Sequence, residues 1–212
     1  MLVSPRTPKR RRSSGPATAI VGVLLMTTAA CSADPEADKP STESTEATVE
    51  STPLAAYDTS EVTVVRAAFC DRISDSAIAV ALGSAASDEH SWQPGGRLPG
   101  SKDIGNEFGC SWTAGQVTAR AWVFAPPITA ERAEDLVSES VGPKCTPRRS
   151  APPLGGPGLA QSCRLNTGAG PVGISGLVGD AWVSCEINGR DDADVGLVGE
   201  WCVVVLEALR GT

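Results

Sequence analysis

Six cysteines in the second part of the chain constrain its fold more than any other feature. They are Cys70, Cys110, Cys145, Cys163, Cys185 and Cys202. An even set of cysteines in an exported chain predicts disulfide bonds, whereas a structural zinc site needs closely spaced pairs of cysteine or histidine. Here the closest two cysteines are 17 positions apart and the chain contains 1 histidine. We therefore predict three disulfides, no metal ion and no other cofactor.

Six cysteines can pair in fifteen ways, so the sequence leaves the connectivity open. We predict the sequential arrangement, in which each bridge links neighbouring elements: a helix to a hairpin, the two ends of a loop rich in proline and glycine, and the last strand to the last helix. Closing loops of this length stabilises a domain by roughly 3 kcal/mol per bridge. The predicted pairs are Cys70 with Cys110, Cys145 with Cys163, and Cys185 with Cys202.

The first 30 residues have the plan of a signal peptide, which marks the chain as exported. Basic residues at positions 6 and 9–12 precede an uncharged apolar run at 17–30. A helix over that run would span roughly 21 Å, less than the roughly 30 Å of a hydrocarbon core. We therefore expect a cleaved signal peptide at 1–30 and no permanent transmembrane helix there.

Small residues stand directly before Cys31, and this end of the run resembles the bacterial lipobox, with Thr28 in the place of the usual leucine. The resemblance implies cleavage before Cys31 and a diacylglyceryl group, with palmitate, on its sulfur. Two acyl chains anchor a domain far more firmly than one, because each buried methylene adds about 0.8 kcal/mol. We expect the chain on the extracytoplasmic face of the cell membrane, held by the lipid on Cys31.

The residues after the signal divide into a tether and a domain. Residues 31–56 contain no aromatic residue and are rich in Ser, Thr and Glu, so they cannot bury enough surface to offset the entropy of ordering. Residues 57–212 contain all 5 Trp, all 3 Phe and the six cysteines considered above. We predict a disordered tether at 31–56 and a single globular domain at 57–212.

Periodicity within the domain predicts an α+β fold. Asp71 and Thr129 are candidate caps for the first two helices, Gly83 and Gly142 are candidate stops, and Ala114-Gly115 is a turn of hairpin length. The strands and helices alternate irregularly, which favours an antiparallel sheet with helices packed on one face, stapled by disulfides. The predicted helices cover 71–82, 129–139 and 195–209, and the predicted strands cover 108–113, 116–124, 159–165, 172–178 and 181–187.

One stretch of the domain is similar to a known family. Cys70 is followed by a short amphipathic segment ending in Leu82-Gly83, then by a variable loop and Cys110-Ser111-Trp112. This order over 69–124, with Trp201-Cys202 further on, resembles the secreted lipoproteins of actinobacteria in the domain-of-unknown-function family numbered 3558. The resemblance implies an exported lipoprotein and no established activity.

Several motifs that carry chemistry elsewhere are interpreted as structural here. The glycine pattern at 168–173 fits a dinucleotide-binding loop, but Pro171 and later glycines favour a strand over the helix that such a loop must open. His90 lies in a polar stretch without a nucleophile motif, which predicts a solvated loop residue. Asp191, Asp192 and Asp194 lack the spacing of a calcium loop, so we expect them to cap the last helix. Lys144, Arg148 and Arg149 form a basic cluster that we expect to be solvated.

Charge excludes one class of partner. The net charge is −7, with 18 basic against 25 acidic residues, so no nucleic acid is expected to bind. The absence of a catalytic motif favours a non-enzymatic module of the cell envelope that binds a small molecule or an envelope protein; the alternatives are an envelope hydrolase or a purely structural surface lipoprotein. An apolar groove near Trp92 or Trp122 would favour binding, and a pocket holding His90 beside two carboxylates would favour hydrolysis. The oligomeric state is not predicted.

Overall fold

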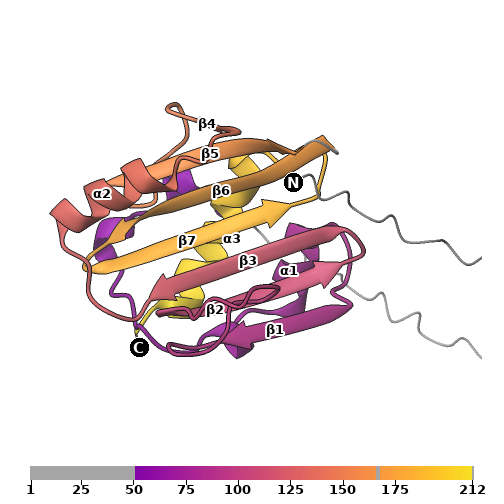
Figure 1. Ribbon diagram of the computed structural model, residues 1–212, viewed down its shortest axis with the longest axis horizontal. Helices are drawn as coiled ribbons and strands as arrows, with labels where there is room; N and C mark the ends of the chain where they lie inside the picture. Colours follow the sequence, from indigo (N-terminus) through magenta and orange to yellow (C-terminus); the bar gives the residue numbers. More distant parts are fainter. Residues whose placement is uncertain (1–50, 166–167, 212) are drawn as a thin grey trace, which may run out of the picture. The chain divides into compact units, whose positions relative to one another are not determined.

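A computed structural model describes residues 51–165 and 168–211. The predicted signal peptide at 1–30, the lipidation site Cys31 and most of the predicted tether lie outside the described residues. Within them, the chain forms one antiparallel sheet of seven strands in the order β1-β2-β3-β7-β6-β5-β4, together with three α-helices (Figure 1). The strands are β1 (Asp88–Trp92), β2 (Glu107–Ala114), β3 (Val117–Phe124), β4 (Cys145–Pro147), β5 (Gly158–Leu165), β6 (Gly168–Val178) and β7 (Ala181–Asn188).

Two helices, α1 (Asp75–Leu82) and α3 (Val195–Leu209), cover one face of the sheet, behind it in Figure 1. Alternation along β7 explains the face: every second residue from Ala181 to Ile187 enters the main core. The inner apolar stripe of α3, which faces the sheet, is buried against these strands. This stripe consists of Val198, Cys202, Val205, Leu206 and Leu209.

The third helix, α2 (Ala130–Ser140), packs on the other face. Its Ala133 and Leu136 form a small separate cluster with Leu177 of β6 and Trp182 of β7, residues that alternate with the main core positions. The α+β antiparallel architecture is therefore as predicted, and two of the three helices share one face. The amphipathic pattern of α2 did not reveal that its apolar side meets the opposite face.

Helix boundaries follow from local capping, and one cap differs from prediction. Thr129 and Asp194 cap α2 and α3 through hydrogen bonds from the backbone N–H groups three residues on, as expected for these residue types. The first helix begins later than predicted, because the chain makes a 3₁₀ turn at Cys70–Arg72 and extends at Ile73. Ser74, not Asp71, is its N-cap and accepts from Ala77 N at 3.3 Å, and Gly83 ends it in the left-handed conformation at φ 78°.

The domain begins before the predicted boundary at residue 57. A 3₁₀ turn at Leu54–Ala56 lies against α3, and Leu54 is only 4% exposed. Gly199 of α3 permits this approach, because a Cβ there would lie 3.1 Å from the Leu54 side chain. The turn at Leu54–Ala56 therefore packs on the domain, although the sequence predicted that it belongs to the tether.

Two of the three predicted disulfides are present, Cys70–Cys110 and Cys145–Cys163. The first joins the 3₁₀ turn before α1 to β2, and the second joins facing residues of β4 and β5. The prediction of a third bridge, Cys185–Cys202, was wrong. Both residues are buried as free thiols between β7 and α3. Burial is the main cause that raises the pKa of the Cys202 thiol well above its ordinary value, and a hydrogen bond with Cys185 is a smaller one. The thiol therefore keeps its proton in the core.

Two short strands that periodicity did not predict form the edges of the sheet. The polar segment Asp88–Trp92 is β1, so His90 lies in an edge strand and not in the predicted loop. Its pairing with β2 requires Gly109, because the Trp92 ring occupies the space that a Cβ there would fill. The other edge, β4, has three residues and ends in Pro147.

Candidate functional site: the groove between α1 and α3

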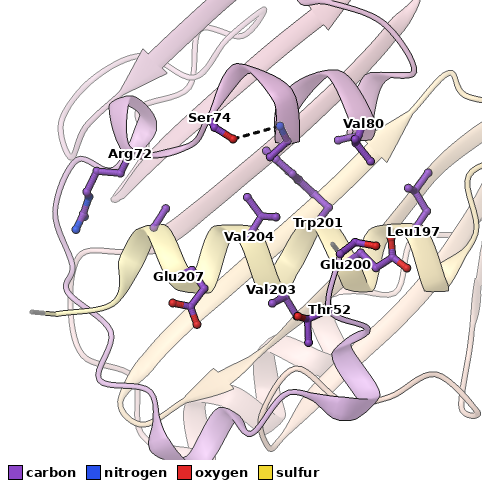
Figure 2. A pocket seen from close by; sticks show the side chains of 14 residues that line it. Thr52, Arg72, Ser74, Val80, Leu197, Glu200, Trp201, Val203, Val204 and Glu207 are labelled. Carbon is purple, nitrogen blue, oxygen red and sulfur yellow. Dashed lines mark hydrogen bonds between the residues drawn. The ribbon is translucent and has the colours of Figure 1, made fainter. Parts of the chain in front are cut away.

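A groove of about 420 Å³ runs along the outer side of α3, between α1 and the segment that enters the fold at Ser51 and Thr52. Figure 2 shows Trp201 and Val204 of α3 pointing towards α1, whereas Val203 lies on the side of Thr52. Its volume is within the range of sites for small molecules, roughly 300–1,000 Å³. We name this feature the α1–α3 groove.

The groove exists because α3 is apolar on two sides. Besides the stripe that packs on the sheet, a second series recurs at helical spacing and faces the groove: Leu197, Trp201, Val204 and Ala208. Two small residues of α1, Ala77 and Ala81, stand opposite. Small side chains fill little of the space between two helices, so the channel stays open.

The floor of the groove is fixed by Trp201. This side chain is 2% exposed, its ring meets Trp112 edge to face with centroids 5.5 Å apart, and its Nε1 donates to the Arg120 carbonyl at 3.1 Å. Edge-to-face aromatic pairs add about 0.5–1.5 kcal/mol beyond their buried area. Trp201 therefore forms a rigid, packed floor, and the exposed apolar surface of the groove comes from residues around it, such as Val80.

The charged residues of the described lining stand at the rim of the groove (Figure 2). Arg72 lies at one end, Glu200 and Glu207 line the length of α3, and Glu207 accepts a hydrogen bond from the Tyr57 hydroxyl at 2.5 Å. Burial, together with this hydrogen bond, raises the pKa of Tyr57 to about 12, so the phenol keeps its proton at neutral pH. Tyr57 thereby ties the entering segment to α3 and keeps the rim in place.

The structure places the predicted His90 on an exposed surface. Its side chain is 63% exposed, and Nε2 lies 3.1 Å from Asp88 Oδ2 within the same edge strand. Ser111 faces His90 across β1 and β2. In the described part of the chain, one carboxylate accompanies this histidine, whereas the hydrolase alternative requires a pocket with two.

The other singled-out residues have structural contacts. Asp194 caps α3 as predicted, but Asp192 pairs with Arg190, whose guanidinium also donates to the carbonyls of Val80 and Ala81 at the end of α1. The glycine pattern at 168–173 lies in β6, so no helix follows it. In the basic cluster, Arg148 Nε donates to Ser162 Oγ at 2.8 Å.

Sequence reasoning missed the α1–α3 groove. The expected marker was a groove near Trp92 or Trp122, whereas the tryptophan at this site is Trp201, which had been noted only for its place beside Cys202. A signal was available, because Leu197 and Val204 fall outside the inner stripe of α3 yet are apolar. Their spacing predicts a second contact surface but does not say what occupies it.

Searches against protein families and curated proteins returned no match to this chain. Across residues 51–165 and 168–211, no helix is both long and apolar enough to cross a bilayer. The same residues contain no group of three or more His, Cys, Asp or Glu side chains placed to hold a metal ion.

Proposed function

We propose that this chain is a membrane-anchored extracytoplasmic lipoprotein that acts as a binding module of the cell envelope, with no catalytic activity. Its ligand is a small elongated apolar molecule, of the kind that an acyl chain represents, held in the α1–α3 groove. The resemblance of the N-terminal segment to lipoprotein signals supports the cellular place. The apolar lining of the groove supports the ligand class.

The observation that carries the proposal is an apolar surface left open between two helices that are otherwise packed. Val80 of α1 is 47% exposed at the mouth of the groove. Val204 and Leu197 are half-buried on the facing helix, and both contact the main core. Covering such surface with an apolar ligand is favourable by about 25 cal/mol per Å². The charged rim leaves the ends of a bound chain in water.

Binding of the neutral fluorescent probe N-phenyl-1-naphthylamine tests the proposal. The full chain should enhance the fluorescence of the probe, and dodecanol should displace it. Val80→Lys places a charge at the mouth of the groove and should weaken probe binding by roughly tenfold, equivalent to about 1.4 kcal/mol.

The matched control is Ile104→Lys, because Ile104 is an exposed apolar residue, 58% exposed, away from the groove. This variant should bind the probe like the wild type, and both variants should unfold at nearly the wild-type temperature. Equal probe affinity in Val80→Lys and Ile104→Lys would rule out the groove as the binding site.

A further inference from the structure

A second cavity, of about 270 Å³, lies on the opposite face of the sheet, between α2 and the aromatic side chains of β3. Three small residues form its floor, Ser184, Ser175 and Gly173. Across the strands, Ser184 pairs with Ser175, and Gly173 pairs with Glu186. Taller residues continue these rows, with Trp122 beside Ser184 and Gln161 beside Gly173. The pairing register of the strands therefore creates the cavity, because it places small residues next to one another.

The polar groups at one end of this cavity are acceptors. The Glu186 carboxylate lies 3.9 Å from Arg120 Nη1, too far for a hydrogen bond. The Gln161 amide donates through Nε2 to the Ser140 carbonyl, which leaves its Oε1 buried without a partner among the described residues. A buried acceptor without a donor costs free energy, so this end favours a ligand with N–H groups.

The charge of the cavity favours a cation. The Glu186 side chain is 24% exposed, and burial raises its pKa while the Arg120 guanidinium acts in the opposite direction. Arg120 does not line the cavity, so the carboxylate is the charge that a ligand would meet there. The Glu186 carboxylate is half-buried, and its only ion-pair partner among the described residues stands 3.9 Å away, so a cation in the cavity would compensate its charge.

Three aromatic residues also line this cavity. Trp122, Phe124 and Trp182 line the cavity next to Leu136 of α2. Aromatic faces attract cations and also stack on flat apolar groups. From these contacts we infer that the cavity binds a small primary amine in its protonated form, with the ammonium group between Glu186 and Gln161 and an apolar body against Trp122.

Benzylamine, which is protonated at pH 7, is the probe for this site. Calorimetry and quenching of tryptophan fluorescence on the full chain should show saturable binding. Benzyl alcohol has the same ring without the charge and should bind at least tenfold more weakly. Glu186→Gln should weaken benzylamine binding at least tenfold, and Trp122→Leu should weaken it to a smaller extent.

Two controls separate this proposal from the others. Glu89→Gln removes an exposed carboxylate on β1 and should leave benzylamine binding unchanged. Glu186→Gln should also bind N-phenyl-1-naphthylamine like the wild type, so failure of one site is distinguishable from failure of the α1–α3 groove. Equal benzylamine affinity in Glu186→Gln and the wild type would overturn the inference. Binding to vesicles of phosphatidylethanolamine that is lost in Glu186→Gln would support the site and identify its amine as a lipid headgroup instead of a free small molecule.

Discussion

The two faces of the sheet differ in how they are covered. One face packs under α1 and α3 and carries a continuous apolar core. The other face is covered in part by α2, and beside this helix it carries serines, a glycine and Glu186. The same strands supply both faces, because neighbouring residues of a strand point in opposite directions. Along β7, Val183 and Cys185 enter the core, and Ser184 and Glu186 line the second cavity. Stability and polar recognition are therefore encoded in alternate positions of one segment.

This difference teaches where each kind of site can arise. On the helical face, a groove forms where two helices meet through small residues, and its lining is apolar because it borders the core. On the face that carries α2, a cavity forms where small residues interrupt taller rows, and its lining includes the polar groups of Ser184, Glu186 and Gln161. The two faces should therefore respond differently to the same kind of substitution.

The largest expected effect comes from a matched pair of leucine substitutions. Leu206→Ala removes a fully buried side chain from the main core and should lower the free energy of unfolding by roughly 3–5 kcal/mol. Leu136→Ala acts on the small cluster under α2, where Leu136 is 8% exposed, and should cost less, about 1–3 kcal/mol. Chemical denaturation of both variants checks the order. A larger loss in Leu136→Ala would reverse the assignment of the main core.

A smaller effect of opposite sign is expected at Glu186. Burial raises the pKa of this carboxyl in the folded chain, so the folded state holds the proton more tightly than the unfolded state does. The free energy of unfolding of the wild type therefore falls as the pH rises towards and through the folded pKa. Below about pH 4 the carboxyl is protonated in both states, so this loss is absent. Glu186→Gln should raise the melting temperature by roughly 2–4 °C at pH 7, and the difference should vanish near pH 4.

Thermal melting of the two proteins across this pH range provides the measurement. Arg120 loses a partner in the variant, but its side chain is 42% exposed and remains solvated. A variant that is less stable than the wild type at pH 7 would mean that the Arg120–Glu186 pair outweighs the cost of burial.

The smallest effect concerns the two thiols. Cys185 and Cys202 are buried, and thiol reactivity requires both access and the thiolate, so neither should be alkylated by iodoacetamide in the folded chain. Both should be alkylated after unfolding without reductant, in contrast to the four bridged cysteines. Peptide mapping identifies each residue. Recovery of a Cys185–Cys202 peptide under these conditions would restore the third bridge that the spacing had predicted.

Local signals in the sequence determined some elements well. The bounds of α3 were predicted because Asp194 caps the helix and the apolar stripe continues to Leu209. The bridges Cys70–Cys110 and Cys145–Cys163 followed from the sequential arrangement. By contrast, β1 has no alternating apolar residues, and it is defined by backbone pairing with β2 that the segment itself does not encode. The start of α1 was misjudged because Asp71 and Ser74 are both good caps, and only the extended backbone at Ile73 selects the second.

Local patterns could not predict the shape of either cavity, although Trp122, near which a groove was considered from the sequence, does line the second one. Leu197 and Val204 of α3 show a second apolar stripe, but the width of the groove depends on how α1 lies against α3. The polar cavity depends on register, because Trp122, Ser184 and Ser175 become neighbours only when β3, β7 and β6 pair in this order. Trp122 of β3 and Ser175 of β6 are more than fifty positions apart in the sequence, so local sequence patterns cannot predict that they lie close together.

The strand order also governs how copies of the domain behave towards one another. A protein that we propose is tethered to a membrane is confined to a plane, where neighbouring sheets meet often. Exposed edge strands invite growth of one sheet into the next. Here one edge is the short, charged β1, and the other is the three-residue β4, which ends in Pro147 and is covalently fixed to β5. Proline offers no N–H to an incoming strand. Both ends of the sheet thus resist polymerisation, so a crowded layer of these domains should remain a layer of separate molecules.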